Sequence, residues 1–244
     1  MRGDNTIYLD GETLSSSEVQ MVAEGKASVA IAQDSWVKIN AARSVIDGIL
    51  ERGETVYGIN TGFGALVKER ISVEDLADLQ TNLIRSHATG LGEFMSKELV
   101  RGMMVTRANS LAKGCSGVHP DVVNQLIAFI NSDICPAIPR IGSLGASGDL
   151  APLSHMALSL IGEGEVLTET GVGPTRDALL ANGLIGVKLR AKDGLSLING
   201  TSQMLSLLVA AEQRLSQLLP LADIIMCCSL EARKGSVRPA DERV

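Results

Sequence analysis

The sequence has few aromatic residues and no concentrated block of charge. Tryptophan, tyrosine and phenylalanine make up 2% of its 244 residues, so the interior has to be built from aliphatic side chains, alanine and methionine. This composition favours helices over a β-sandwich. The net charge of −6 is spread along the chain, which argues against nucleic acid as a partner.

Cysteine and histidine are scarce as well. The four cysteines form no C-x-x-C pair and the histidines number three, so we expect buried thiols and no metal centre. The amino terminus lacks the apolar stretch of an export signal. The longest uncharged segment, 194–211, contains Asn199 and Gln203, whose amides are costly in hydrocarbon. We therefore expect a cytoplasmic protein without a membrane span.

Apolar residues make up 45% of the chain and charged residues 20%, which indicates a packed protein. A strand is predicted at 6–9 and a β-hairpin near 165–167. Periodicity and capping signals predict helices at 34–53, 72–90, 96–113, 120–131, 152–162 and 175–183, and a long one from Asn199 to about 230, kinked at Pro220. The expected fold is mainly α, a bundle of long helices with a small amino-terminal β and loop region.

The helical pattern breaks between residues 135 and 148, where prolines and glycines crowd together and predict an irregular loop. Within it, Ala146, Ser147 and Gly148 combine a small residue, a hydroxyl that can leave as water, and an unhindered glycine amide. Attack of the Gly148 nitrogen on the Ala146 carbonyl, with loss of two waters, would give 4-methylideneimidazol-5-one (MIO), and Ser147 would supply its methylidene. The alternatives are a glycine-rich turn or a phosphate-binding loop, but neither the Walker pattern nor G-x-G-x-x-G is present.

The fifteen-residue block IGSLGASGDLAPLSH, at 141–155, resembles the MIO-forming loop of the histidine and aromatic amino acid ammonia-lyases. Three further blocks agree with that family in order and spacing. YGINTGFG at 57–64 resembles its mobile tyrosine loop, NLIRSHATG at 82–90 its substrate-pocket helix, and GLSLINGT at 194–201 the stretch with its catalytic asparagine. The resemblance covers nearly the whole chain. The sequence at Ser86-His87 is more similar to histidine ammonia-lyase than to the phenylalanine or tyrosine enzymes.

The resemblance implies a role for each matching residue. Tyr57 would be the acid-base residue, and Gly64 is one of the glycines that would let its loop close over a substrate. Asn199 would hold the ring and the substrate through its amide, with a plain helix-start asparagine as the competing interpretation. His87 would read the imidazole of a histidine substrate, or else be an ordinary interior histidine.

Two polar residues follow the ring-forming tripeptide. Asp149 is expected to cap the helix after the loop or to assist cyclisation. That helix, which Pro152 predicts to begin just after the loop, would turn its positive end towards the ring. His155 on the same helix is expected to be a buried histidine with its hydrogen bonds satisfied.

Family members continue well past the point where this chain ends, so residues 1–244 match the MIO-bearing amino-terminal portion and stop within the central helical region. A fragment and a half-length subunit completed by another chain both remain open. The resemblance implies a small amino acid substrate and a homotetramer, or a hetero-oligomer with a carboxyl-terminal chain. Two alternatives to a histidine ammonia-lyase stay open: an aromatic amino acid lyase or aminomutase, and a catalytically silent assembly subunit.

Overall fold

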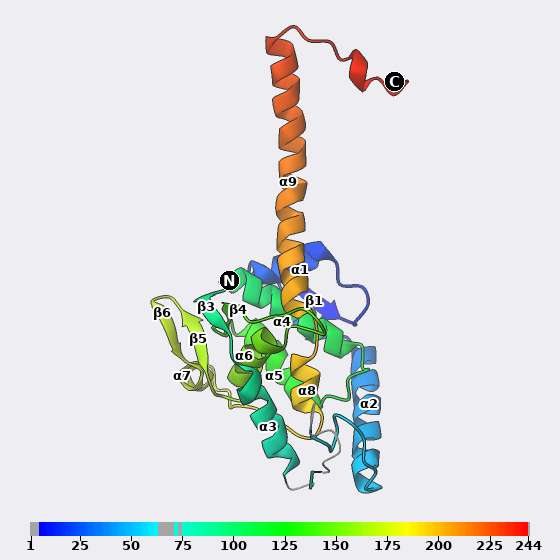
Figure 1. Cartoon of the computed structure of the whole chain (residues 1–244), viewed down its shortest axis with the longest axis vertical. Coiled ribbons are helices and arrows are strands. Elements are labelled where there is room, and N and C mark those ends of the chain that lie inside the picture. Colours follow the sequence, from blue (N-terminus) through cyan, green and yellow to red (C-terminus); the bar gives the residue numbers. More distant parts are fainter. Residues whose placement is uncertain (1–4, 63–70, 73–74, 244) are drawn as a thin grey trace.

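The computed structural model describes residues 5–62, 71–72 and 75–243. It is a mainly helical body from which one long helix projects (Figure 1). In chain order its elements are β1 (Thr6–Leu9), α1 (Ser16–Ala23), β2 (Ser28–Ile31), α2 (Gln33–Glu51), α3 (Leu76–His87), β3 (Leu91–Phe94), α4 (Lys97–Ala112), α5 (Pro120–Asn131), β4 (Pro139–Ile141), α6 (Leu150–Leu160), β5 (Glu165–Thr168), β6 (Gly171–Pro174), α7 (Thr175–Ala181), α8 (Asp193–Ile198), α9 (Ser202–Ala232) and a 3₁₀ turn at Arg238–Ala240.

Local signals explain where several helices begin. Ser15 accepts a hydrogen bond from the Glu18 amide while the Glu18 side chain reaches back to Ser15, so α1 starts with a full capping box. Ser96 caps α4 through the Leu99 amide, and Pro120 occupies the first turn of α5. The predicted helices at 96–113 and 120–131 are confirmed.

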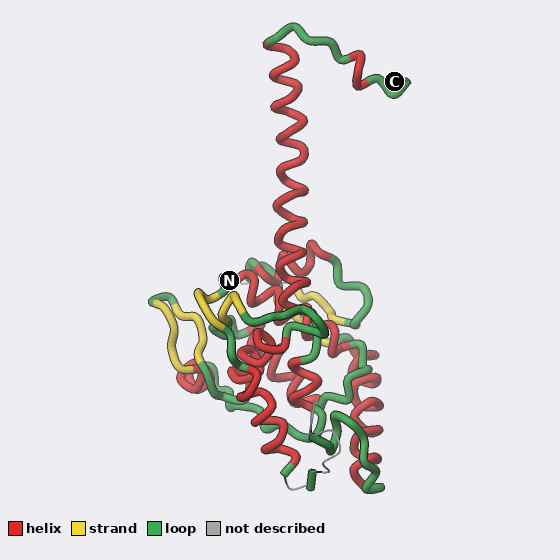
Figure 2. Tube along the Cα trace, viewed as in Figure 1, coloured by secondary structure: helices red, strands yellow, loops and turns green. Residues whose placement is uncertain are grey.

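The strands form three small two-stranded sheets at the edges of the helical body (Figure 2). β5 and β6 are the predicted antiparallel hairpin. β1 lies where the sequence predicts a strand and pairs in parallel with β2. β3 and β4 pair across a long chain separation and close one edge of the ring-forming loop.

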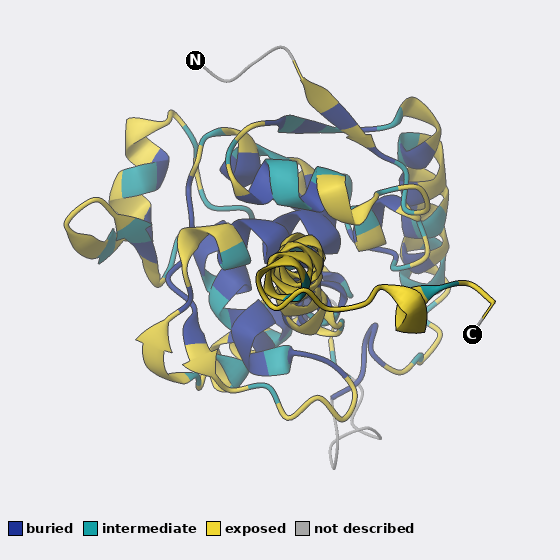
Figure 3. Cartoon of the chain, turned by 90° about the horizontal axis from the view of Figure 1, so that it is seen from above, coloured by how far each residue is buried: buried dark blue, intermediate teal, exposed yellow. Residues whose placement is uncertain are grey.

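The core is aliphatic, as the composition predicts. Seen from above, the buried residues gather around the middle of the body, where α4 and α5 lie (Figure 3). Met103, Met104, Leu126 and Ile130 from these two helices are fully buried. This tightly packed centre supports α6, α8 and the inner part of α9.

α9 has two unlike halves. Its first turns pack on α4, where Ser202, Gln203, Ser206 and Val209 are buried. Beyond residue 210 the helix leaves the body and exposes a run of large apolar side chains: Leu215, Leu218, Leu219, Leu221, Ile224, Ile225 and Met226. By length and composition alone, the helical stretch 193–232 is apolar enough to cross a membrane, a test that an apolar helix covered by protein also passes.

The sequence prediction of a single helix from Asn199 is wrong at its start. α8 ends at Ile198, residues 199–201 are not helical, and α9 begins at Ser202 and continues through Pro220. Asn199 therefore follows one helix instead of beginning another. The interruption matters because it leaves Asn199 on the connection that passes the ring-forming loop.

Candidate active site

The predicted loop is irregular from residue 142 to residue 149, and it leaves Ala146 and Ser147 exposed while Gly148 is buried. Gly148 has no room for a side chain. A Cβ atom there would lie 2.8 Å from the Gly200 oxygen, 3.0 Å from the Gly200 nitrogen and 3.2 Å from Asn199 Oδ1. Only glycine fits this close approach, so the structure brings the third residue of the tripeptide against Asn199 and Gly200.

Asp149 ties this loop to the start of α9. It stands at the N-cap position of α6, but its side chain makes no cap bond there. Its Oδ2 accepts hydrogen bonds from the amides of Gln203 at 2.8 Å and Met204 at 3.0 Å. Its own amide donates to the Gly200 oxygen at 2.7 Å. A carboxylate facing the amide end of α9 is favourable because the helix dipole is positive there.

The expected cap of the helix after the loop therefore has to be corrected. α6 begins at Leu150, before Pro152, and the fully buried Asp149 carboxylate caps α9 instead. Ser143 donates to the other carboxylate oxygen at 2.7 Å. The end of the loop is therefore fixed by two sets of hydrogen bonds, one to Ser143 near its beginning and one to the start of α9 far along the chain.

His87 and the Ala146-Ser147-Gly148 tripeptide line the same cavity, whose volume is about 280 Å³. His87 ends α3, and its Nδ1 lies 2.9 Å from the Leu83 carbonyl oxygen. Because a carbonyl oxygen only accepts, Nδ1 must carry the proton in this contact, and Nε2 of the neutral ring is then an acceptor. The structure thus places His87 in the cavity that Ser147 lines, with Nδ1 held by the Leu83 carbonyl.

Tyr57 lies on a separate loop and is 57% exposed. The next residue, Gly58, has a φ of +76°, and a Cβ atom there would lie 2.8 Å from Leu195 Cδ2 of α8. The loop therefore rests on the helix that leads to Asn199. Tyr57 is not among the described residues that line the cavity with His87 and Ser147, and Gly64 lies outside the described residues.

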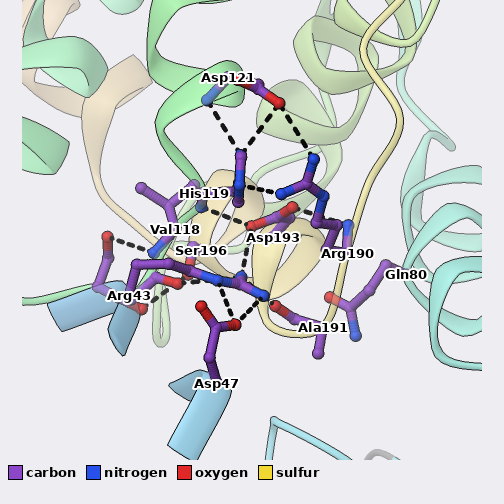
Figure 4. A network of polar contacts seen from close by, with 12 residues as sticks. Arg43, Asp47, Gln80, Val118, His119, Asp121, Arg190, Ala191, Asp193 and Ser196 are labelled. Carbon is purple, nitrogen blue, oxygen red and sulfur yellow. Dashed lines mark hydrogen bonds and ion pairs between the residues drawn. The ribbon is translucent and has the colours of Figure 1, made fainter. Parts of the chain in front are cut away.

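A buried polar network holds the beginning of α8 (Figure 4). Asp193 is fully buried and accepts hydrogen bonds from the amides of His119 at 2.8 Å and Arg190 at 2.7 Å. Arg43 lies 3.5 Å from its Oδ1 and donates to the Ala191 carbonyl at 2.9 Å. Burial outweighs these partners and raises the pKa of Asp193 to about 6.

A buried guanidinium holds the other end of α8. Arg107 of α4 donates from Nη2 to the carbonyl oxygens of Ser196 and, at 3.1 Å, of Asn199. Helix carbonyls at this end have no partner within the helix, so an outside donor satisfies them. α8 is therefore anchored at both ends, and Asn199 leaves it in a fixed direction towards Gly148.

The other two histidines serve the fold. His155, predicted to be a buried histidine with its hydrogen bonds satisfied, is half-buried; its Nε2 accepts a hydrogen bond from the Gly90 amide at 3.0 Å, and burial lowers its pKa. His119 caps α5 by accepting from the Asp121 amide, and burial is the main cause of its lowered pKa. Among the described residues, no three His, Cys, Asp or Glu side chains gather as metal ligands do.

The sequence analysis missed Arg107, Asp193 and Gly200. Arg107 did carry a signal, because it stands in α4 among buried apolar residues, where a charge is costly. Asp193 and Gly200 carried none, since their importance comes from contacts with residues distant in the chain. The structure brings Ala146, Ser147, Gly148, Asp149, Asn199 and His87 into one region, while the roles assigned to them stay predictions.

Comparison with known proteins identifies the family. The family model for aromatic amino acid lyases matches residues 14–244. A histidine ammonia-lyase of Geobacillus thermodenitrificans is 43% identical over 98% of this chain and 47% of its own length. An MIO-dependent tyrosine 2,3-aminomutase of Streptomyces globisporus is 41% identical over 96% of this chain and 43% of its own length.

Solved structures show the same relationship. The crystal structure of histidine ammonia-lyase from Trypanosoma cruzi superposes with a TM-score of 0.88 at 37% identity, over 95% of this chain and 45% of that one. The chain spans about half the length of the curated relatives it matches. It belongs to the aromatic amino acid lyase family.

Proposed function

We propose that residues 1–244 form the ring-bearing portion of a histidine ammonia-lyase, which converts histidine to urocanate and ammonia. The observation that carries this proposal is the pairing of two features. The Ala146-Ser147-Gly148 tripeptide ends on a glycine pressed against Asn199 and Gly200, and the same tripeptide shares a cavity with His87. The identity to a histidine ammonia-lyase supports it.

The residues present fit an MIO group made from the chain itself. The Gly148 nitrogen would bond to the Ala146 carbonyl carbon, whose oxygen leaves as water, and Ser147 would lose its hydroxyl and one α-hydrogen as a second water. The ring supplies an electrophile that draws electrons from the substrate. The close contact of Gly148 with Asn199 and Gly200 and the hydrogen bonds of Asp149 would hold the end of the loop in place for this closure.

The remaining residues would bind the substrate and move its proton. In neutral His87, Nε2 can accept a hydrogen bond from the imidazole N–H of a histidine substrate, because Nδ1 is engaged with the Leu83 carbonyl. Asn199 would hold ring and substrate through its amide. Tyr57, whose side chain is exposed, would take the β-proton as the amino group leaves, which requires its loop to close over the cavity.

A lyase or aminomutase acting on tyrosine is the second candidate, because the Streptomyces aminomutase is nearly as similar as the histidine enzymes. Both candidates use the same ring. They differ in the substrate side chain that would lie against His87, since a phenol or phenyl ring lacks the N–H donor of imidazole.

We further propose that protein covers the outer half of α9, either from other copies of this chain or from a chain that carries the carboxyl-terminal half. Its large exposed apolar side chains are costly in water. Covered in this way, the helix belongs to a cytoplasmic protein and not to a membrane.

The test is product analysis on the purified enzyme given histidine and tyrosine in separate reactions. The proposal predicts loss of ammonia from histidine with urocanate as the product, and at most slow conversion of tyrosine. Conversion of tyrosine in preference to histidine would favour the second candidate. Stable folded enzyme that carries the ring and converts neither would contradict both.

A further inference from the structure

Arg107 is a buried cation without a carboxylate partner among the described residues. It is 4% exposed, and burial lowers its pKa to about 10. Its Nε is buried and has no hydrogen-bond partner in the described part of the chain. Burying a charge in this way is expensive, so its contacts should compensate for the cost.

Arg101 shows what an ordinary structural arginine looks like on the same helix. It is equally buried, but its Nη1 pairs with Asp133 at 2.7 Å and its Nε donates to the Val22 carbonyl at 2.8 Å. Its partners hold helices of the body together, away from the candidate site. Arg107 differs because both carbonyls that it binds belong to the segment of Asn199.

Gly200 completes the contact. The three atoms nearest to a Cβ added at Gly200 all belong to the guanidinium of Arg107, and the closest would overlap it. On its other side, the Gly200 oxygen accepts the Asp149 amide at 2.7 Å. The main chain at 199–200 is thus held between a buried arginine and the end of the ring-forming loop.

We propose that Arg107 is a positioning residue, whose guanidinium fixes the main chain of Asn199 and Gly200 against the Ala146-Ser147-Gly148 loop. This inference rests on the proposed function, because it concerns the geometry that the ring and Asn199 need. Arg107 touches neither the tripeptide nor the cavity of His87. It acts by setting where the Asn199 amide stands relative to Gly148.

The experiment compares Arg107→Met with Arg101→Met in the complete enzyme assembly. Ring content is measured by intact mass, which falls by two water molecules per ring, and kcat is expressed per ring-bearing subunit. Arg107→Met should lower kcat about 100-fold with KM changed less than about threefold, since an error of an ångström in a catalytic group costs about that much. Arg101→Met should lower stability and leave kcat per ring unchanged.

Gly200→Ala provides a second variant that leaves α4 intact, in case Arg107→Met does not fold. Its methyl group displaces the guanidinium, so we expect the same loss of kcat. In an Arg107→Ala background the added methyl group meets no guanidinium, so Gly200→Ala should lower kcat no further. Such non-additive effects on kcat would not arise if each substitution only lowered stability in general.

The outcomes separate the two proposals. The positioning role is overturned if the Arg107 and Gly200 variants have the same kcat per ring as Arg101→Met. The proposed function still stands in that case, provided that the wild-type enzyme carries the ring and converts histidine. Folded wild-type enzyme without the ring overturns the proposed function and this inference with it.

Discussion

The two sides of the candidate site differ in how far their key residues are exposed. On the ring-forming side, Gly148, Asp149 and Gly200 are tied to one another by close main-chain contacts and buried hydrogen bonds. On the other side, Tyr57 stands more than half exposed on a loop. Under the proposed function this contrast has a physical reason: ring closure would need a fixed main chain, and Tyr57 would have to approach the cavity after a substrate enters.

The largest expected effect falls on the ring-forming side. Ser147→Ala removes the hydroxyl that leaves as water, so no methylidene forms and turnover is abolished. Intact mass and a product assay check both results. Ser143→Ala in the same loop is the control, because it loses one hydrogen bond to Asp149 but should keep the ring. A Ser147→Ala enzyme with wild-type turnover would contradict the assignment.

Tyr57→Phe probes the exposed tyrosine. Loss of a general acid-base group slows catalysis by about 10²–10⁴-fold. Stability and ring content should stay at wild-type values because the side chain is 57% exposed. Kinetics, intact mass and urea unfolding measure the three quantities, and Tyr8→Phe, at an equally open position, should change none of them. Retained turnover in Tyr57→Phe would show that another group moves the proton.

Asp193 makes the support of α8 sensitive to pH. Burial raises its folded-state pKa to about 6 from the ordinary value of 3.8, so its contribution to stability is present below pH 3.8 and is lost as pH rises through 6. The free energy of unfolding of wild type minus that of Asp193→Asn should therefore fall by about 2 kcal/mol between pH 4 and pH 7.

Urea unfolding across that pH range is the measurement. The groups facing Asp193 are Arg43, Arg190 and His119, and His119 contributes with the opposite sign because its pKa is lowered. Asp121→Asn, at a side chain that is 57% exposed, serves as the control and should leave the slope nearly unchanged. A difference between wild type and Asp193→Asn that does not fall with rising pH would show that the partners of Asp193 outweigh its burial.

His87→Phe gives the smallest effect and tests specificity. The loss of one hydrogen bond to substrate is worth about 1 kcal/mol, so KM for histidine should rise about fivefold to tenfold while ring content stays constant. The ratio of kcat/KM for histidine to that for tyrosine should fall. An unchanged ratio would make His87 an interior histidine that ends α3.

Much of the fold follows from local sequence signals. Pro120 starts α5 and Ser96 starts α4 as predicted, and the prolines and glycines between 135 and 148 do mark an irregular loop. The pairing of β3 with β4 could not be predicted, because its short strands carry no alternating pattern and their partners lie far apart in the chain.

The site was predictable only in part, for a similar reason. The tripeptide, Asn199 and His87 could be found because each stands in a distinctive local block. Asp149 was expected to cap its own helix, yet it caps α9, because the choice between two nearby helix starts is made by tertiary packing. Arg107 reaches Asn199 across 92 positions of sequence, which no local pattern records.

The most direct test of the account is the mass of the peptide that contains Ala146, Ser147 and Gly148, taken from folded wild-type protein. We expect the wild-type peptide to be lighter than the mass of its sequence by two water molecules. In the Ser147→Ala variant, the peptide should have the full mass of its own sequence, in which alanine lacks the serine oxygen. A wild-type peptide at the full mass of its sequence, from protein shown to be folded, would contradict the account.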